Sequence, residues 1–163
     1  MTVELTAVSK HWVVINNDDQ CRSSAELNRQ IKAALGLKKI PVICLNEVAY
    51  QLPYPFAERL ANRLSNILAG IQKSAISQVI FAYHPQWIVG PLDRPQSWQM
   101  VINIRLIRDV LKDLYGQTVS RQVKIVLIGS QTGSITDKIA DEMDFKKVRS
   151  CNDKQFDSTP CAK

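Results

Sequence analysis

The chain has 163 residues, of which 45% are hydrophobic and 22% are charged, and its formal net charge is +6. This composition is typical of a globular domain with a proper core, and it excludes an intrinsically disordered chain. No apolar stretch approaches the roughly 18–20 residues of a membrane-spanning helix, and the amino terminus lacks the pattern of a secretory signal. We therefore expect one cytoplasmic domain over residues 1–163, with a flexible tail from residue 152.

Cysteine and histidine spacing predicts neither a disulfide framework nor a metal site. The four cysteines (Cys21, Cys44, Cys151 and Cys161) form no CxxC pair, and neither histidine stands at zinc-ligand spacing. We expect free thiols in a reducing compartment, and neither a metal nor a cofactor. The positive charge invites a nucleic-acid hypothesis, but the lysines and arginines are spread over predicted helices rather than gathered in one run. A solvated basic surface is the simpler interpretation, and nucleic-acid binding is a remote alternative.

Short apolar runs alternate with amphipathic segments along the chain. In chain order, strands are expected at residues 12–15, 40–45, 78–83, 123–128 and, as a weak fifth strand, 145–148. Helices are expected at residues 25–35, 56–71, 97–115 and 135–143. Such alternation predicts repeated βαβ units and a parallel sheet covered by helices, with right-handed crossovers. The pattern leaves open whether this sheet is doubly wound, with helices on both faces, or curved like part of a barrel.

Several residues define the ends and faces of the predicted helices. Ser23 and Ser24 offer N-caps for the first helix, and Gly36 ends it. The second helix carries one apolar stripe: Leu60, Leu64, Ile67, Leu68 and Ile71. For the helix over 97–115 we expect an inner side made of Trp98, Val101, Ile104, Ile107 or Leu106, Val110, Leu111 and Leu114, with Gly116 at its end.

Residues 79–90, VIFAYHPQWIVG, closely resemble the signature of the triosephosphate isomerase family, a strand that reads roughly V-x-A-Y-E-P-x-W-A-I-G. Four further segments resemble that family in the right order and at nearly the right spacings. They are WVVINNDD (12–19), PVICLNE (41–47), IRDVLKDLYG (107–116) and VKIVLIGSQTG (123–133). The resemblance covers most of the chain, and it implies a common descent.

The resemblance implies a (β/α)8 barrel that interconverts dihydroxyacetone phosphate and glyceraldehyde 3-phosphate. In that family a glutamate base moves the proton and a neutral histidine polarises the carbonyl. A lysine from the first strand stabilises charge, backbone amides of glycine-rich loops hold the phosphate, and a lid closes over the site.

Three positions of the implied catalytic site carry other residues in this chain. His84 stands at the position of the base, Asn17 at the position of the electrophilic histidine, and Asp19 at that of a neighbouring glutamate. Imidazole can act as a base, but its shape, its reach and its charge on protonation differ from those of a carboxylate. The amide of Asn17 can donate a hydrogen bond but cannot shuttle a proton. The alternative is an inert strand-end role for His84, and turn or cap roles for Asn17 and Asp19.

The implied phosphate and lid region is altered as well. The glycine pairs that hold the phosphate align with Ile128-Gly129, followed by a retained Ser130, and with Arg149 and Ser150. A Cβ at such positions obstructs the approach of an anion to backbone N–H groups, so we expect weak binding of a phosphorylated ligand at most. The lid keeps Pro85, Trp87 and Gly90 but reads GPLDRPQ, where the family is rich in glycine, lysine and threonine.

A barrel of this kind usually takes about 250 residues, and the chain resembles it from the helix before the fourth strand through the eighth strand. We therefore expect a truncated, half-barrel α/β domain of about five βα units, without strands one to three. Residues with structural roles are retained, among them Cys44, which we expect in the core, and Glu47. Trp87 and Trp98 are interpreted as packing anchors.

These observations favour a catalytically inactive relative of triosephosphate isomerase that serves as a structural or protein-binding component. Five parallel strands of an unclosed barrel leave two bare edges and expose an apolar inner face. A second copy, another protein chain or a rearranged sheet is expected to cover them. The alternative is an active isomerase on triose phosphates whose missing half comes from a partner chain.

Overall fold

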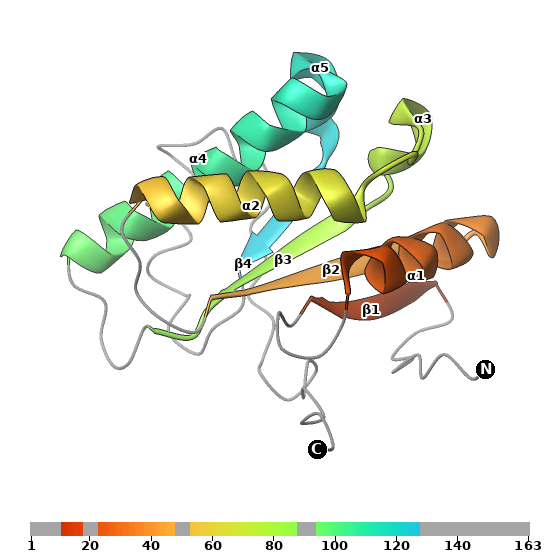
Figure 1. Cartoon of the computed structure of the whole chain (residues 1–163), viewed down its shortest axis with the longest axis horizontal. Coiled ribbons are helices and arrows are strands. Elements are labelled where there is room, and N and C mark those ends of the chain that lie inside the picture. The colour runs from red at the N-terminus through yellow and green to blue at the C-terminus, as the bar shows by residue number, and fades with distance from the viewer. Residues whose placement is uncertain (1–10, 18–22, 48–52, 88–93, 128–163) are drawn as a thin grey trace.

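The structure of the chain, a computed structural model, describes residues 11–17, 23–47, 53–87 and 94–127. Figure 1 shows these residues as one sheet with a layer of helices above it. The expected helix at residues 135–143, the weak strand at 145–148 and the tail from residue 152 lie outside the described residues, as do Cys21, Cys151 and Cys161.

The described strands form one parallel sheet, as the sequence predicts. They are β1 (Trp12–Asn17), β2 (Ile40–Glu47), β3 (Ile80–Pro85) and β4 (Lys124–Leu127), and they lie side by side in the order β1-β2-β3-β4. Every neighbouring pair is parallel. Within the described residues the sheet is open rather than closed, since β1 and β4 each pair on one side only. The fold is therefore an α/β fold with an open, truncated barrel-type sheet.

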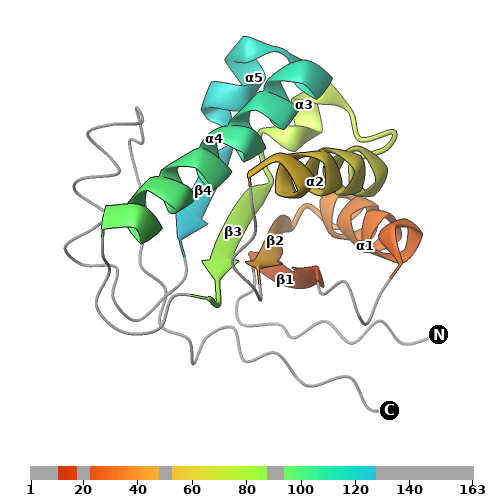
Figure 2. The same ribbon diagram turned by 60° about the vertical axis from the view of Figure 1, so that its left-hand side comes forward.

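Three long helices connect these strands. They are α1 (Ser24–Gly36), α2 (Pro53–Ile67) and α4 (Arg94–Tyr115), and two short helices, α3 (Lys73–Ile76) and α5 (Gln117–Gln122), precede β3 and β4. Both views of the ribbon show α1, α2 and α4 on the same face of the sheet (Figures 1 and 2). The described helices thus follow the arrangement of a barrel wall and not that of a doubly wound sheet.

The main core lies between the sheet and these helices. Side chains that are almost fully buried come from every layer, for example Ile31 of α1, Leu64 of α2, Phe81 of β3 and Ile104 of α4. The predicted stripe of α2 is buried in full. Burying one such side chain contributes about 1.5–3 kcal/mol, so this layer dominates the stability of the described fold.

A smaller apolar cluster lies on the other face of the sheet. Its buried members are Val42, Cys44 and Ala82, packed with the partly buried Trp12, Val14, Ile80 and Val126. The Cys44 side chain is buried in the core, as expected. The expectation of a bare inner face is wrong for the centre of this cluster, because Ala82 has no exposed area and Val42 has only 4%.

The ends of α1 agree with the sequence in one respect and differ in another. Ser23 is the N-cap, and its side chain accepts a hydrogen bond of 3.2 Å from the backbone N–H of Glu26. Gly36 is the last helical residue, yet the backbone turns left-handed two residues later, at Lys38, where φ is 56°. The glycine is therefore not the residue that reverses the chain at this end.

The inner face of α4 was predicted correctly in its middle and wrongly at both ends. Val101, Ile104, Ile107 and Leu111 are buried, whereas Trp98 is 57% exposed and Leu114 is 41% exposed. Trp98 stands seven residues before Arg105, so it lies on the solvent side with that residue. Trp98 is not a packing anchor in the described structure.

Strand β3 begins two residues later and ends two residues later than the sequence suggests. The turn that follows the short helix α3 occupies the start of the predicted strand, and the backbone N–H groups of Gln78 and Val79 donate to the carbonyls of Ala75 and Ile76. At the other end β2 extends to Glu47, which pairs with Pro85. His84 therefore lies within the strand and not after it.

The connection from α4 to β4 is fixed by Arg108. Its guanidinium donates to the carbonyl of Ser120, and at 2.7 Å to that of Val123, while the Ser120 hydroxyl donates back to the carbonyl of Arg108 at 2.8 Å. Gly116 allows the turn before α5, because its φ of 90° is one that side chains rarely adopt. Among the described residues, no helix is long and apolar enough to cross a membrane.

Candidate functional site

The carboxyl ends of the parallel strands form one edge of the sheet, which is where α/β barrels carry their active sites. β2 ends with Asn46 and Glu47, and β3 ends with His84 and Pro85. Asn46 pairs with His84 in the register, and Glu47 pairs with Pro85. Because successive side chains in a strand point to opposite faces, Asn46 and His84 share one face of the sheet.

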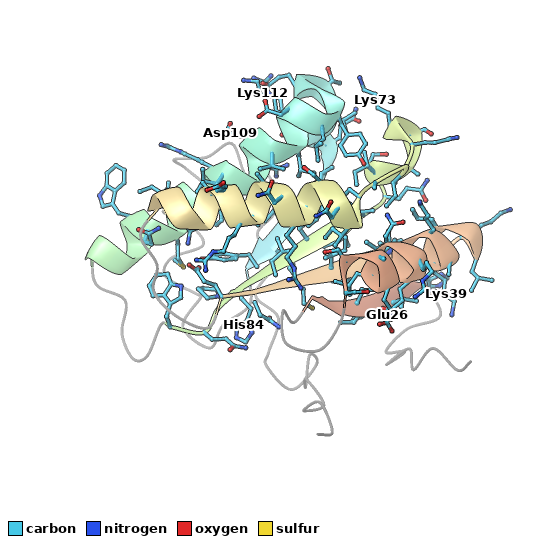
Figure 3. All side chains as sticks on the ribbon, viewed as in Figure 1. Glu26, Lys39, Lys73, His84, Asp109 and Lys112 are labelled. Atoms are coloured by element: carbon cyan, nitrogen blue, oxygen red, sulfur yellow. The ribbon has the colours of Figure 1, made fainter. Side chains whose placement is uncertain are left out.

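His84 belongs to the face opposite the helices. The alternation along β3 places it with Ala82 of the smaller apolar cluster, whereas Tyr83 belongs to the main core. The side chain of His84 is half-buried and makes at least one specific interaction. Figure 3 labels it at the carboxyl end of the strands, away from the helix layer. This is the face that lines the interior of a closed barrel.

Asn17 reaches the same edge of the sheet from another strand. It is the last residue of β1 and pairs with Leu45, one register position before Asn46. Since β2 lies between β1 and β3, the backbones at Asn17 and His84 are separated by two strand spacings, about 10 Å. The structure thus brings the two positions to one edge without making them neighbours.

Of the residues that the sequence predicted for the lid, two are described. Pro85 is buried at the end of β3, and Trp87 is half-buried against the main core. The backbone N–H of Gln86 donates to the carbonyl of Glu47 at 2.8 Å, which joins this segment to the end of β2. Six predicted site residues lie outside the described residues: Asp19, Gly90, Gly129, Ser130, Arg149 and Ser150.

A buried polar cluster, which the sequence motifs do not predict, lies under the helices next to this edge. The phenol of Tyr83 donates to Oε2 of Glu47, and Nδ2 of Asn103 lies 2.9 Å from both that oxygen and the Tyr83 hydroxyl. Gln99 completes the cluster by donating to Oδ1 of Asn103 at 2.8 Å. All four side chains are at least 96% buried. We call Glu47, Tyr83, Gln99 and Asn103 the polar cluster.

The polar cluster holds a carboxylate in a place that disfavours a second charge. Burial raises the pKa of Tyr83 well above its usual range, and the Glu47 carboxylate raises this pKa further, whereas hydrogen bonds with Asn103 and Trp87 lower it. The phenol therefore stays protonated and acts as a donor to Glu47. Oε1 of Glu47 has no hydrogen-bond partner among the described residues.

A weak sequence signal for this cluster does exist. Gln99 and Asn103 are spaced four residues apart inside a helix whose inner side is otherwise apolar, and this spacing brings two side chains together. Two amides in such a stripe indicate a buried partner. The sequence cannot say that the partner is Glu47, because 56 residues separate Asn103 from it.

The chemistry of the described edge is limited. The polar cluster lies on the helix side of the sheet, and His84 lies on the other side, so the carboxylate of Glu47 does not contact the imidazole. In the described part of the chain, no group of three or more histidine, cysteine or acidic side chains could hold a metal ion. The edge therefore carries one half-buried imidazole beside Asn46, and the polar cluster on the helix side of the sheet holds the strand end in place.

Comparison with known proteins identifies a family for nearly the whole chain. The family model described as triosephosphate isomerase matches residues 7–147, a range that includes all four described strands. The triosephosphate isomerase of Clostridium botulinum (strain Okra) is 27% identical over 144 residues, which are 85% of this chain and 58% of that protein. The isomerase of Syntrophotalea carbinolica is 24% identical over 146 residues, 82% of this chain and 55% of that protein.

A third relative also matches over only part of its length. The triosephosphate isomerase of Dictyoglomus turgidum is 23% identical over 124 residues, which are 73% of this chain and 50% of that protein. The chain therefore spans between one half and three fifths of the length of these curated relatives.

Proposed function

The chain belongs to the triosephosphate isomerase family, and we propose that it is a non-catalytic member that acts as a structural or protein-binding component. The observation that carries the proposal is His84. It occupies the strand end where the resemblance to the family implies a glutamate base. Its side chain belongs to the face that lines the interior of a barrel. Asn17, at the position of the electrophilic histidine, supports the same conclusion.

The proposal rests on what each side chain can do with a proton. A carboxylate becomes neutral when it accepts a proton, whereas an imidazole becomes a cation, so proton abstraction by His84 would leave a positive charge where the family has a neutral acid. An asparagine amide does not titrate and cannot return a proton to an oxygen. Loss of one acid–base group typically costs about 10²–10⁴-fold in rate. With both groups replaced, ordinary isomerase turnover is not expected.

The shape of the described sheet supports a protein partner. β1 and β4 each have one edge without a strand neighbour among the described residues, and an unpaired edge is a template for another strand. The apolar face opposite the helices also carries side chains that are only partly buried, Trp12, Val14, Ile80 and Val126. A second protein chain, or a second copy, that adds a strand and covers these side chains is the occupant that fits.

A coupled assay with glyceraldehyde 3-phosphate tests the catalytic part of the proposal. The expected result is no turnover above the uncatalysed rate for the full chain, for His84→Ala, and for the control Trp98→Ala at an exposed helix position. Turnover at an ordinary enzymatic rate that disappears in His84→Ala and persists in Trp98→Ala would overturn the proposal.

Analytical ultracentrifugation tests the partner separately. We expect the purified full chain to sediment as a dimer or larger species at micromolar concentration, or to form a larger complex when its partner is added. A stable, cooperatively folded monomer that binds no partner would contradict a structural or protein-binding role. Trp12→Asp, at a partly buried position of the apolar face, is expected to weaken the association.

The second candidate is an active isomerase on triose phosphates that is completed by a partner chain. The polar cluster favours it, since Glu47 and Tyr83 hold the strand end just before Pro85 and Trp87. Such an arrangement positions the start of the lid that the resemblance implies. The same coupled assay, run after mixing with the partner, separates the two candidates.

A further inference from the structure

The amino-terminal edge of the sheet, opposite to His84, has an unusual charge distribution. In a parallel sheet with crossover helices, every segment that enters a strand lies at this edge. The described entering segments are residues 37–40, 68–79 and 116–124. They contain Lys38, Lys39, Lys73, Arg121 and Lys124, and they contain no aspartate or glutamate.

Two contacts show that the charges of neighbouring segments lie close together. Nζ of Lys32, from α1, lies 3.2 Å from the place where a Cβ on Gly70 would stand, so this ammonium group covers the second entering segment. Nζ of Lys73, from that second segment, lies 3.6 Å from the equivalent place at Gly116, at the start of the third. The contacts thus join α1, which leads into the first segment, to the second segment, and the second segment to the third, so that their cations form one band of positive charge at this edge.

We call this band the basic edge. It consists of Lys32, Lys38, Lys39, Lys73, Lys112, Arg121 and Lys124, all of which are exposed except the half-buried Lys39. Figure 3 shows the labelled Lys73 and Lys112 at the far end of the molecule from His84. Two exposed acids, Asp109 and Asp113, flank Lys112 on α4 and offset part of the positive charge at that end of the band.

Stabilisation of helix ends explains only part of this charge. Cations in the last turn of a helix interact favourably with its dipole, and Lys73, Lys112 and Arg121 occupy such positions. Lys38 and Lys39 follow the end of α1, and Lys124 is the first residue of β4. The positions of these three cations lie outside the helices, so stabilisation within a last helical turn does not explain them.

The polar residues between the cations indicate the chemistry of that partner. The exposed side chains of the second and third entering segments include Gln72, Ser74, Gln78, Gln117, Thr118 and Gln122. Lysine, arginine, serine, threonine and glutamine are the side chains that contact phosphate oxygens of nucleic acids. The three segments contain no aromatic residue on which an unpaired base could stack.

We propose that the basic edge binds the phosphodiester backbone of double-stranded nucleic acid without reading its sequence. The surface differs from the carboxyl edge and from the apolar face, so this inference does not depend on the proposed function. The large exposed apolar side chains near the edge, among the described residues, are Leu37, Ile40 and Leu114, an area too small to insert into a lipid surface in the way that amphipathic anchors do.

Fluorescence anisotropy with a random-sequence DNA duplex of about 20 base pairs tests the proposal on the full chain. We expect micromolar binding at low salt that weakens as salt rises, because counterions are released from the phosphates. In the triple variant Lys38→Glu, Lys39→Glu, Lys73→Glu, affinity is expected to fall at least tenfold. The slope of log affinity against log salt is expected to become shallower by about 3, at roughly 0.9 per phosphate contact.

The matched control reverses three exposed arginines on the outer surface of the helices, in the variant Arg29→Glu, Arg59→Glu, Arg105→Glu. Each reversal changes the charge by two, so both triple variants reduce the net charge from +6 to zero. The control is expected to lose less than threefold in affinity. Thermal melting confirms that both variants fold.

Three results would overturn the proposal. They are equal losses in the two triple variants, no binding of the duplex at low salt, and tighter binding of vesicles rich in anionic lipid that depends on Leu37. In the last case Leu37→Ser would abolish vesicle binding, and the edge would be a membrane surface.

Discussion

The two edges of the sheet are held by different kinds of interaction. At the carboxyl edge, Tyr83 and Asn103 both donate to one oxygen of the buried Glu47 carboxylate. At the amino edge, side chains of the helices donate to backbone carbonyls, as Arg108 does to Val123 and Asn28 does to Ile67. The carboxyl edge therefore depends on one charge and on the protonation of one phenol. The amino edge depends on several separate bonds to neutral acceptors.

The largest effect is expected from Asn103→Leu at the carboxyl edge. This change removes a donor from the buried Glu47 carboxylate and leaves the Tyr83 phenol as its remaining donor among the described side chains. We expect the free energy of unfolding to fall by about 2–3 kcal/mol, since hydrogen bonds to charged groups are worth about 1.5–3 kcal/mol. Urea titration followed by circular dichroism measures it. Asn62→Leu, at an exposed position of α2, is the control, and equal losses in both variants would show that the carboxylate is not the cause.

At the amino edge, Arg108→Leu is expected to cost about 2 kcal/mol. Two carbonyls, those of Ser120 and Val123, lose their donor before β4 begins. The guanidinium is half-buried, and this burial lowers the pKa of Arg108. Arg105→Leu on the exposed side of the same helix serves as the control. A smaller loss in Arg108→Leu than in Arg105→Leu would contradict the role assigned to it.

Both edges are expected to respond to alkaline pH, the carboxyl edge more strongly, because burial raises the pKa of Tyr83 well above its usual range and raises less the pKa of Tyr115, which donates to the carbonyl of Leu68 at the amino edge. The folded-state pKa of Tyr83 is raised above 10, mainly by burial. Stability that depends on the neutral phenol is therefore complete below pH 10 and is lost as the pH rises through the folded-state pKa. Between those values the free energy of unfolding should decline by about 1.4 kcal/mol per pH unit from this group. Tyr83→Phe should lack this component, which urea titrations at pH 9 to 11 would reveal, whereas an unchanged slope would argue against it.

The smallest effect is expected at the junction of α1 and α2. Nδ2 of Asn28 donates to the carbonyls of Ile67 at 2.7 Å and Ala69 at 3.0 Å, where α2 ends. Because these acceptors are partly accessible to water, Asn28→Ala should cost only about 1 kcal/mol. Asn62→Ala provides the baseline. A loss as large as that of Asn103→Leu would remove the contrast between the two edges.

Much of the described fold follows from local sequence patterns. Ser23 caps α1, and the apolar stripe of α2 is buried, because both features depend on residues within one or two turns. The four parallel strands follow from their short apolar runs. Trp98 shows where the pattern fails, since a large apolar residue near a helix end was assigned to the core and is exposed. The apolar periodicity of a helix does not indicate how far along the helix the neighbouring layer of the core extends.

The features that carry the site depend on contacts between distant segments. The polar cluster joins Glu47 to Asn103, and the basic edge joins Lys32 to the segment at Gly70. These residues are far apart in the sequence, on separate helices and connections. From the sequence alone, the lysines and arginines therefore look like a dispersed, solvated basic surface. Only the parallel topology, which returns every connection to the same edge, brings them together. His84 is the opposite case, because a single segment, VIFAYHPQWIVG, was enough to indicate its place at the end of a strand.

The most direct test of the central claim is proton exchange at the substrate carbon. Dihydroxyacetone phosphate is incubated with the full chain in D₂O, and deuterium incorporation at the carbon next to the carbonyl is followed by NMR. A base that removes this proton must leave deuterium there when the solvent returns it, even if isomerisation is incomplete. Incorporation is expected to be no faster than in buffer. Incorporation that requires the chain, disappears in His84→Ala and persists in Trp98→Ala would contradict it.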